Sequence, residues 1–171
     1  MSKENLFNRE AIDKLKELAE GIQIAIMETS LKSLPPHTIP MSTKEVDDEG
    51  CIWFLSSEKS VHNQNIDTDN SVQLIYSNPK EMKFLTIFGQ AIVYKGRVIL
   101  ERYYEKADNA WFDGVSDPDL TAIKVIPKEA HYWDTENGKF INLLKMGISA
   151  VTGNSQDLGT QGDLKISIEE H

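Results

Sequence analysis

The sequence has one cysteine, Cys51, among 171 residues. A single thiol excludes an internal disulfide framework, a multi-cysteine zinc site and an iron–sulfur cluster. Positive charge is also scarce, because 18 lysines and arginines face 27 aspartates and glutamates, for a formal net charge of −9. This balance argues against non-specific binding to nucleic acid or an anionic membrane, which needs clustered Lys and Arg. It leaves room for a small phosphorylated ligand in one local pocket.

Long apolar runs and common catalytic signatures are absent as well. No apolar run approaches the roughly 20 residues that span a bilayer. The first ten residues are polar and mixed in charge, unlike a secretion signal, and we expect a cytoplasmic protein. GxGxxG, P-loop, HExxH and GxSxG motifs do not occur, and the four histidines lack metal-ligand spacing. We therefore expect no metal site.

The length predicts a single domain, residues 1–171, and the composition of 40% hydrophobic and 26% charged residues is typical of a globular protein. The N-terminal pattern predicts a helix over residues 8–20. Asn8 is a suitable N-cap, and Ile12, Leu15 and Leu18 recur at helical spacing. Gly21 is placed to end this helix in the left-handed conformation.

The pattern then changes to the period of two that is typical of strands. Pro40 lacks an amide donor, so its strand should run along an edge or contain a bulge there. Both faces of residues 83–94 are apolar, which predicts a central strand. A helical turn is expected within residues 58–69 and a helix over residues 96–107. The strands are predicted over residues 22–27, 38–46, 51–55, 72–76, 83–94, 120–126 and 130–133.

These short strands and few helices predict a mainly β fold, an antiparallel barrel over residues 22–135 with helices packed outside it. Apolar residues at helical spacing predict a C-terminal helix over residues 138–151. The remaining residues, 154–171, are expected to form a mobile tail, in which residues 164–168 could add an edge strand.

One constellation of polar residues follows two of the predicted strands. The strand that contains Thr38 is joined through the acidic turn 47–50 to the strand that ends at Ser56 and Ser57, and Lys59, Ser60 and His62 come next. Paired strands offer amides and carbonyls to a flat polar ring. The serines, with a helix starting near Ser60, could hold a phosphate. From spacing alone, a cap on a turn is the favoured interpretation of these serines. The acidic turn itself lacks the spaced ligands of a calcium loop and is expected to be solvated.

A series of short motifs extends across the chain in a characteristic order. They are PHTIPM at 36–41, VDDEG at 46–50, IWFLSS at 52–57, AWFDG at 110–114, DPDL at 117–120 and YWD at 132–134. In this order and spacing the sequence, over about residues 12–153, resembles the general stress protein group of the pyridoxamine 5′-phosphate oxidase-like, flavin-binding split barrels.

The resemblance implies a six-stranded antiparallel Greek-key split barrel and a homodimer with flavin mononucleotide (FMN), or FAD, in two clefts at the subunit interface. Trp111 would reach the flavin ring from the partner subunit, although a core or interface anchor is an equal interpretation of this residue. The expected cofactor-binding residues are Thr38, Ile39, Pro40, Met41, Leu55, Ser56, Ser57, Ser60, His62 and Trp111.

Two positions depart from the family pattern. Relatives commonly carry Arg before the Pro-Met pair, where this chain has Ile39, and many carry Lys where it has His62. An arginine–phosphate contact contributes roughly 1.5–3 kcal/mol. Its loss predicts a flavin affinity that is weaker by about one to two decades.

Three functions fit these residues. The first is a flavin-dependent oxidoreductase, in which the cofactor carries the electron chemistry. The second is a non-catalytic flavin-binding or stress-buffering dimer. The third is a diverged barrel that binds haem or a deazaflavin, or serves as an interaction module. True pyridoxamine phosphate oxidase activity would need basic residues for the substrate phosphate, and after Val151 the sequence offers only Lys165.

Overall fold

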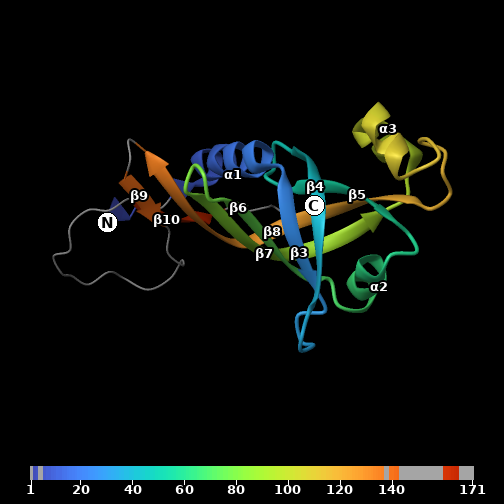
Figure 1. Ribbon diagram of the computed structural model, residues 1–171, viewed down its shortest axis with the longest axis horizontal. Helices are drawn as coiled ribbons and strands as arrows, with labels where there is room; N and C mark the ends of the chain where they lie inside the picture. Colours follow the sequence, from blue (N-terminus) through green and yellow to red (C-terminus); the bar gives the residue numbers. More distant parts are fainter. Residues whose placement is uncertain (1, 4–5, 137–138, 143–159, 166–171) are drawn as a thin grey trace.

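The computed structural model describes residues 2–3, 6–136, 139–142 and 160–165 (Figure 1). Its helices are α1 (Asn8–Ile22), α2 (Val61–Thr68), α3 (Arg97–Tyr103) and the 3-10 helix η1 (Lys106–Ala110). The long strands are β3 (Ile24–Thr29), β4 (His37–Val46), β5 (Ile52–Ser57), β6 (Ser71–Asn78), β7 (Lys83–Tyr94) and β8 (Leu120–Glu136). The short strands are β1 (Ser2–Lys3), β2 (Leu6–Phe7), β9 (Lys139–Asn142) and β10 (Thr160–Lys165).

Strands β3 to β8 form a closed antiparallel barrel. In space their order is β8-β5-β4-β3-β6-β7, and pairing of β7 with β8 closes the circle. Every one of these neighbouring pairs is antiparallel. Strands β3, β4 and β5 follow one another, and β6 returns to the other side of β3, which is a Greek key. The six-stranded split-barrel prediction is confirmed for this part of the chain.

The core lies inside the barrel and under α1. One face of α1 buries Leu15 and Leu18 in the same cluster as the inward residues of the strands. Tyr76 and Phe54 are among the largest fully buried side chains. A second, smaller cluster joins α3 to the outside of the barrel, where Trp53 stacks on Tyr103 with ring centroids 4.8 Å apart. Beside α3, the wall of the barrel is therefore packed on both its inner and its outer surface.

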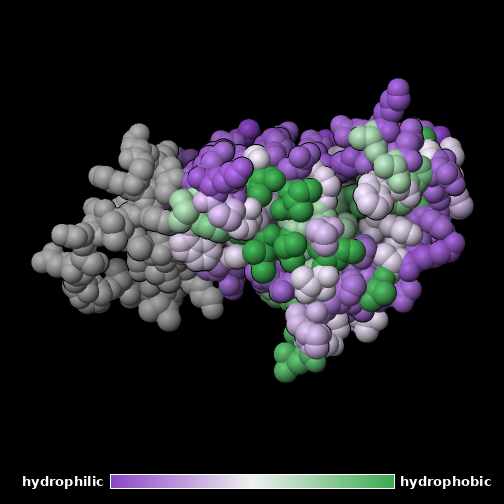
Figure 2. Space-filling view, viewed as in Figure 1, coloured by the Kyte–Doolittle hydropathy of each residue, from purple (hydrophilic) through white to green (hydrophobic). Residues whose placement is uncertain are grey.

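Strand β7 is central, as predicted, but only one of its faces is fully covered. Leu85 and Ile87 point inward and are buried, whereas Phe88 and Ile92 on the other face remain 38% and 39% exposed. In strand β3 the inward residues are Ala25 and Met27, and Ile24 is 47% exposed. Figure 2 shows a hydrophobic area, in green, on the viewed face of the molecule.

The end of α1 differs from the sequence prediction. The helix continues through Gly21 to Ile22, and the left-handed residue is Gln23, with φ of 70°. The amide of Gln23 donates to the carbonyl oxygen of Ala19 at 2.9 Å, which ends the helix. Glycine favours the left-handed conformation without requiring it, and here a polar residue adopts it.

The two strands expected around Pro127 are one continuous strand, β8. A register shift between Phe88 and Gly89 absorbs the proline, and Gly89 pairs with Pro127. A Cβ atom at Gly89 would lie 2.4 Å from the carbonyl oxygen of Ile126, so only glycine fits this crossing. A bulge at a proline lets the strand continue without the missing amide.

The C-terminal predictions are wrong in part. Strand β9 occupies Lys139–Asn142, where the helix over 138–151 was expected to begin, and residues 143–151 lie outside the described residues. Within the expected mobile tail 154–171, β10 pairs with β8 and β9. None of the helices in the described part of the chain is long and apolar enough to span a membrane.

Candidate functional site

Apart from Trp111, the predicted flavin-binding residues lie on β4, on β5 and at the start of α2, on elements that border a fork between β4 and β5. These strands pair from Val46 and Ile52 up to Thr43 and Phe54, and then separate. Beyond this point β4 pairs with β3, and β5 pairs with β8. Ser60, the N-cap of helix α2, comes three residues after the end of β5. The fork is therefore bordered by the first half of β4, the end of β5 and the start of α2.

The first half of β4 has a free edge toward the fork. The amide of Thr43 donates to Gln23 on the β3 side at 2.8 Å. Hydrogen-bonding direction alternates along a strand, so the backbone groups of Thr38, Pro40 and Ser42 point to the opposite edge. Within the described residues no strand pairs with this edge. Pro40, which has no amide, thus sits on an edge as predicted.

The side chains of this segment alternate in the same way. Thr38 and Pro40 are exposed on the outer surface, whereas Met41 is buried and Ile39 packs against the core. An arginine at position 39 would therefore start from the core-facing side of β4. Among the residues expected to line the flavin here, Thr38 and Pro40 are the accessible ones.

Beside the fork, a buried polar network joins β5, α2 and β8. The Ser56 hydroxyl lies 2.6 Å from His62 Nε2 and donates to Asn63 Oδ1 at 2.8 Å. Asn63 Nδ2 donates to the Thr121 hydroxyl, which in turn donates to the Ser56 carbonyl oxygen. The Ser60 hydroxyl caps α2 by accepting from the Asn63 amide at 3.2 Å. Apart from the partly buried cap at Ser60, these bonds join buried groups and satisfy polar atoms that water does not reach.

The hydrogen bonds of Ser56 determine which nitrogen of His62 carries a proton. The single proton of Ser56 goes to Asn63 Oδ1, so Ser56 Oγ accepts, and His62 Nε2 must carry a proton. His62 is only 5% exposed. Burial and then the nearby His37 lower the pKa of His62 to about 4. The imidazole is therefore neutral near pH 7 and adds no charge to the site.

His37 brings the start of β4 beside α2. Its ring is stacked on that of His62, with centroids 6.2 Å apart and an interplanar angle of 12°. His37 Nε2 is buried and has no hydrogen-bond partner in the described part of the chain. A buried polar atom without a partner is costly, and such atoms occur at sites that a ligand completes.

The turn that leads from β5 into α2 carries the available positive charge. Lys59 is 77% exposed at its side chain and pairs with Asp119 at 2.7 Å. The Glu58 amide also donates to the Asp119 carbonyl oxygen, which ties the turn to the start of β8. Exposed ion pairs contribute little, so an anion could compete for this ammonium group.

The structure joins Ser56, Ser60 and His62 in one hydrogen-bonded network, and the stacking of His37 on His62 brings the start of β4 beside it. Leu55 packs instead in the second cluster, with Trp53. Trp111 follows η1, is 83% exposed, and makes no ring contact with any residue of the described chain. The residues predicted from the sequence did not include His37, Asn63 and Thr121. His37 directly precedes the predicted site residue Thr38, which was a signal for it. Thr121 gave none, because its pairing with Ser56 depends on the barrel closing.

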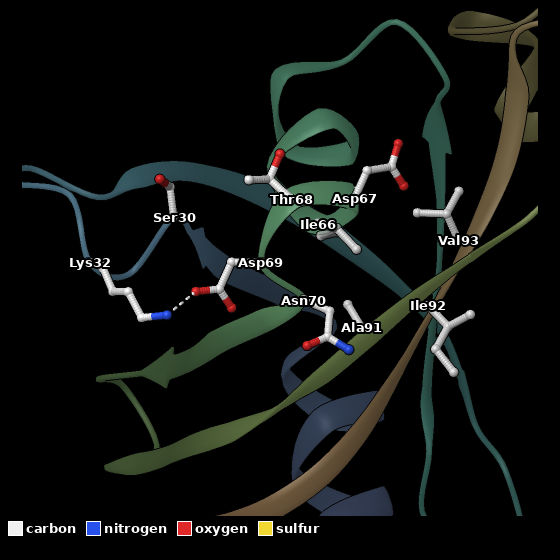
Figure 3. A pocket seen from close by; sticks show the side chains of 10 residues that line it. All are labelled: Ser30, Lys32, Ile66, Asp67, Thr68, Asp69, Asn70, Ala91, Ile92 and Val93. Carbon is white, nitrogen blue, oxygen red and sulfur yellow. Dashed lines mark hydrogen bonds and ion pairs between the residues drawn. The ribbon is translucent and has the colours of Figure 1, made fainter.

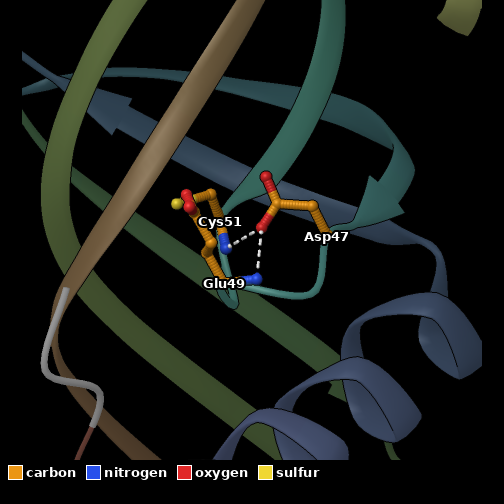
Figure 4. A group of neighbouring side chains, drawn as sticks. All are labelled: Asp47, Glu49 and Cys51. Atoms are coloured by element: carbon orange, nitrogen blue, oxygen red, sulfur yellow. Dashed lines mark hydrogen bonds between the residues drawn. The ribbon is translucent and has the colours of Figure 1, made fainter. Parts of the chain in front are cut away.

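The acidic turn is not arranged as a metal centre. Asp47, Glu49 and Cys51 offer ligand atoms within 4.8 Å of one another (Figure 4). Asp47 Oδ1 already accepts the amides of Glu49 and Cys51, and Asp47 Oδ2 accepts Trp53 Nε1 at 2.8 Å. Burial and the Asp47 carboxylate raise the pKa of the Cys51 thiol to about 12. The group therefore caps the hairpin between β4 and β5.

Comparison with solved structures shows the same fold in several bacterial proteins. General Stress Protein 26 from Bacillus anthracis str. Sterne matches with a TM-score of 0.64 and 17% identity, over 77% of this chain and 98% of that one. The general stress FMN/FAD binding protein from Xanthomonas citri matches with a TM-score of 0.63 and 20% identity, over 84% and 97%. A general stress protein 26 from Jannaschia sp. CCS1 matches with a TM-score of 0.60 and 24% identity, over 76% and 79%.

At the level of sequence, a search of curated proteins found no match. A family model described as pyridoxamine 5′-phosphate oxidase like matches residues 10–157, which is most of the chain. The matched range includes the whole barrel and the fork between β4 and β5. The protein therefore belongs to the pyridoxamine 5′-phosphate oxidase-like family.

Proposed function

We propose that the protein binds FMN at the fork between β4 and β5, at the interface of two copies, and acts as an FMN-dependent oxidoreductase. The family match over residues 10–157 is the observation that carries this proposal. The Xanthomonas citri protein of the same fold is named for FMN/FAD binding, which supports the choice of cofactor.

The residues at the fork fit the flat part of a flavin. The free edge of β4 offers the amides of Thr38 and Ser42 and the carbonyl oxygen of Pro40 to the polar rim of a ring. The unpartnered His37 Nε2 beside them marks a place that a polar ligand would complete. Bound flavin would supply the electron transfer, and the residues of this chain would bind and orient it.

The chain offers few groups that could bind the phosphate of FMN. Ser56 and His62 are bonded to each other inside the barrel, and the neutral imidazole attracts no anion. Ser57, which is partly exposed, and Lys59, which would leave Asp119, remain for the phosphate. We therefore expect FMN to bind only moderately more tightly than riboflavin, which lacks this phosphate.

A second copy would cover the surface beside the fork. Ile24 is 47% exposed on β3, the neighbour of β4, and Phe88 is 38% exposed on β7. Exposed apolar groups that gather on one face are typical of protein–protein interfaces (Figure 2). The exposed Trp111 is free to contact a partner subunit or its flavin.

A non-catalytic flavin-binding protein is the alternative function. The burial of His62 in its hydrogen-bond network favours it, because this commits the nearest imidazole to structure rather than to proton transfer. Mixing the FMN-loaded protein with a nicotinamide electron donor distinguishes the two, since only the oxidoreductase would bleach the flavin absorbance faster than free FMN does.

The test of the proposal is a titration of FMN followed by flavin fluorescence. Thr38→Asp adds a negative charge at the open edge and should weaken FMN binding by about tenfold. Ser77→Asp adds the same charge at an exposed position of β6 and serves as the control. Trp111→Ala should weaken flavin binding or dimerisation. Equal Kd values for the two aspartate variants would refute the location of the site.

A further inference from the structure

An open groove of about 920 Å³ lies beside α2 and shares no lining residue with the predicted flavin site (Figure 3). Its apolar lining residues are Ile66 and Ala91, which are buried, and the more accessible Ile92 and Val93. The Lys32–Asp69 ion pair lies at the other end of the groove (Figure 3). The volume of the groove lies within the range of small-molecule sites.

One wall of the groove is a free strand edge. Strand β7 continues beyond its neighbour β6, whose first residue, Ser71, pairs with Gln90. The Ala91 amide then donates to the Asn70 carbonyl oxygen at 2.8 Å. Because direction alternates along a strand, the N–H and C=O of Val93 point to this same edge. No other backbone group of the described residues bonds to them there.

The polar groups on the rim of the groove form two sets, those that are already bonded and those that are free. Asp69 is fully engaged, since it accepts from Lys32 at 2.8 Å and from the Ser71 amide at 3.1 Å. The Lys32 side chain and this amide lower the pKa of Asp69 to about 2. In contrast, the Asp67 carboxylate and the Asn70 side-chain amide make no hydrogen bond or ion pair with the described residues. The free groups of the groove are thus one carboxylate, one amide and one strand edge.

We infer that this groove binds a small flat molecule that carries an uncharged carboxamide group. The carboxamide oxygen accepts from the Val93 N–H, and its NH2 group donates to the Val93 carbonyl oxygen or the Asp67 carboxylate. The attached ring covers the exposed side chain of Ile92. A carboxylate in place of the carboxamide would face Asp67 and would lack the donors. The inference is independent of flavin binding.

Benzamide and benzoate test this chemistry, because they differ only in that group. Each is titrated into the 15N-labelled full chain and followed by the backbone amide signals of Asn70, Ile92 and Val93. A fragment of this size is expected to bind with a Kd of about 1–10 mM. Saturable shifts at these amides with benzamide, and a response to benzoate at least about fivefold weaker, support the inference. An equal response to both, or no saturable shift, overturns it.

Two exposed residues of the same strand provide a matched pair of variants. Ile92 and Phe88 are 39% and 38% exposed, and only Ile92 lines the groove. Ile92→Ser should weaken benzamide binding about fivefold, and Phe88→Ser should leave it within about twofold. Folding is checked by the dispersion of the remaining signals. An equal loss in both variants would show binding to the general apolar face and would overturn the inference.

Discussion

Acid should destabilise this protein through His62. Its pKa is lowered from 6.5 to about 4 by burial and by His37. Between these two pH values the unfolded chain binds a proton that the folded chain does not. The contribution of His62 to the free energy of unfolding is therefore fully present above pH 6.5 and is lost as the pH falls toward 4. At 1.36 kcal/mol per pKa unit, the loss amounts to about 3 kcal/mol.

Urea unfolding at a series of pH values measures this loss. In His62→Gln, the side-chain amide can still donate to Ser56, but the titrating group is gone. Carboxylates contribute to the pH dependence of both proteins, so the difference between their free energies of unfolding isolates His62. We expect this difference to change by about 3 kcal/mol between pH 7.5 and pH 4. If the free energies of unfolding of the two proteins changed with pH in parallel, His62 would not be a buried, neutral imidazole.

Three further predictions concern the barrel. Gly89→Ala should cost about 3 kcal/mol or more in urea unfolding, because its Cβ would lie 2.4 Å from a carbonyl oxygen, while Gly21→Ala in open space should gain about 0.5–1 kcal/mol. Asp134→Ala leaves the largely buried Lys14 without this partner and should cost about 3 kcal/mol; a loss below 1 kcal/mol would contradict the pair. Cys51 is fully buried, so a thiol reagent should label it only in denaturant, and rapid native labelling would contradict its burial.

Much of the barrel is predictable from local patterns. The bounds predicted for β7, Lys83–Tyr94, are those of the structure, because a long run of β-branched and aromatic residues between turns admits one interpretation. Face assignments were less secure. In β3 the alternation predicted a strand without saying which face is buried, and the structure buries Ala25 and Met27, which lie beside Tyr76 and Leu74 of β6.

Features that depend on contacts between distant residues were not predictable. The continuity of β8 through Pro127 depends on Gly89, which lies on another strand. At the site, sequence spacing brought Ser56, Ser60 and His62 together correctly. It could not show that they bond to one another inside the barrel, because Thr121 and the closure of β5 on β8 decide this.

The most direct test of flavin binding between two copies is the visible absorption spectrum of the protein after mixing with FMN and desalting, measured together with its sedimentation. We expect retained flavin bands that migrate with a dimer. A colourless protein that remains folded and monomeric would contradict flavin binding at a fork between two copies.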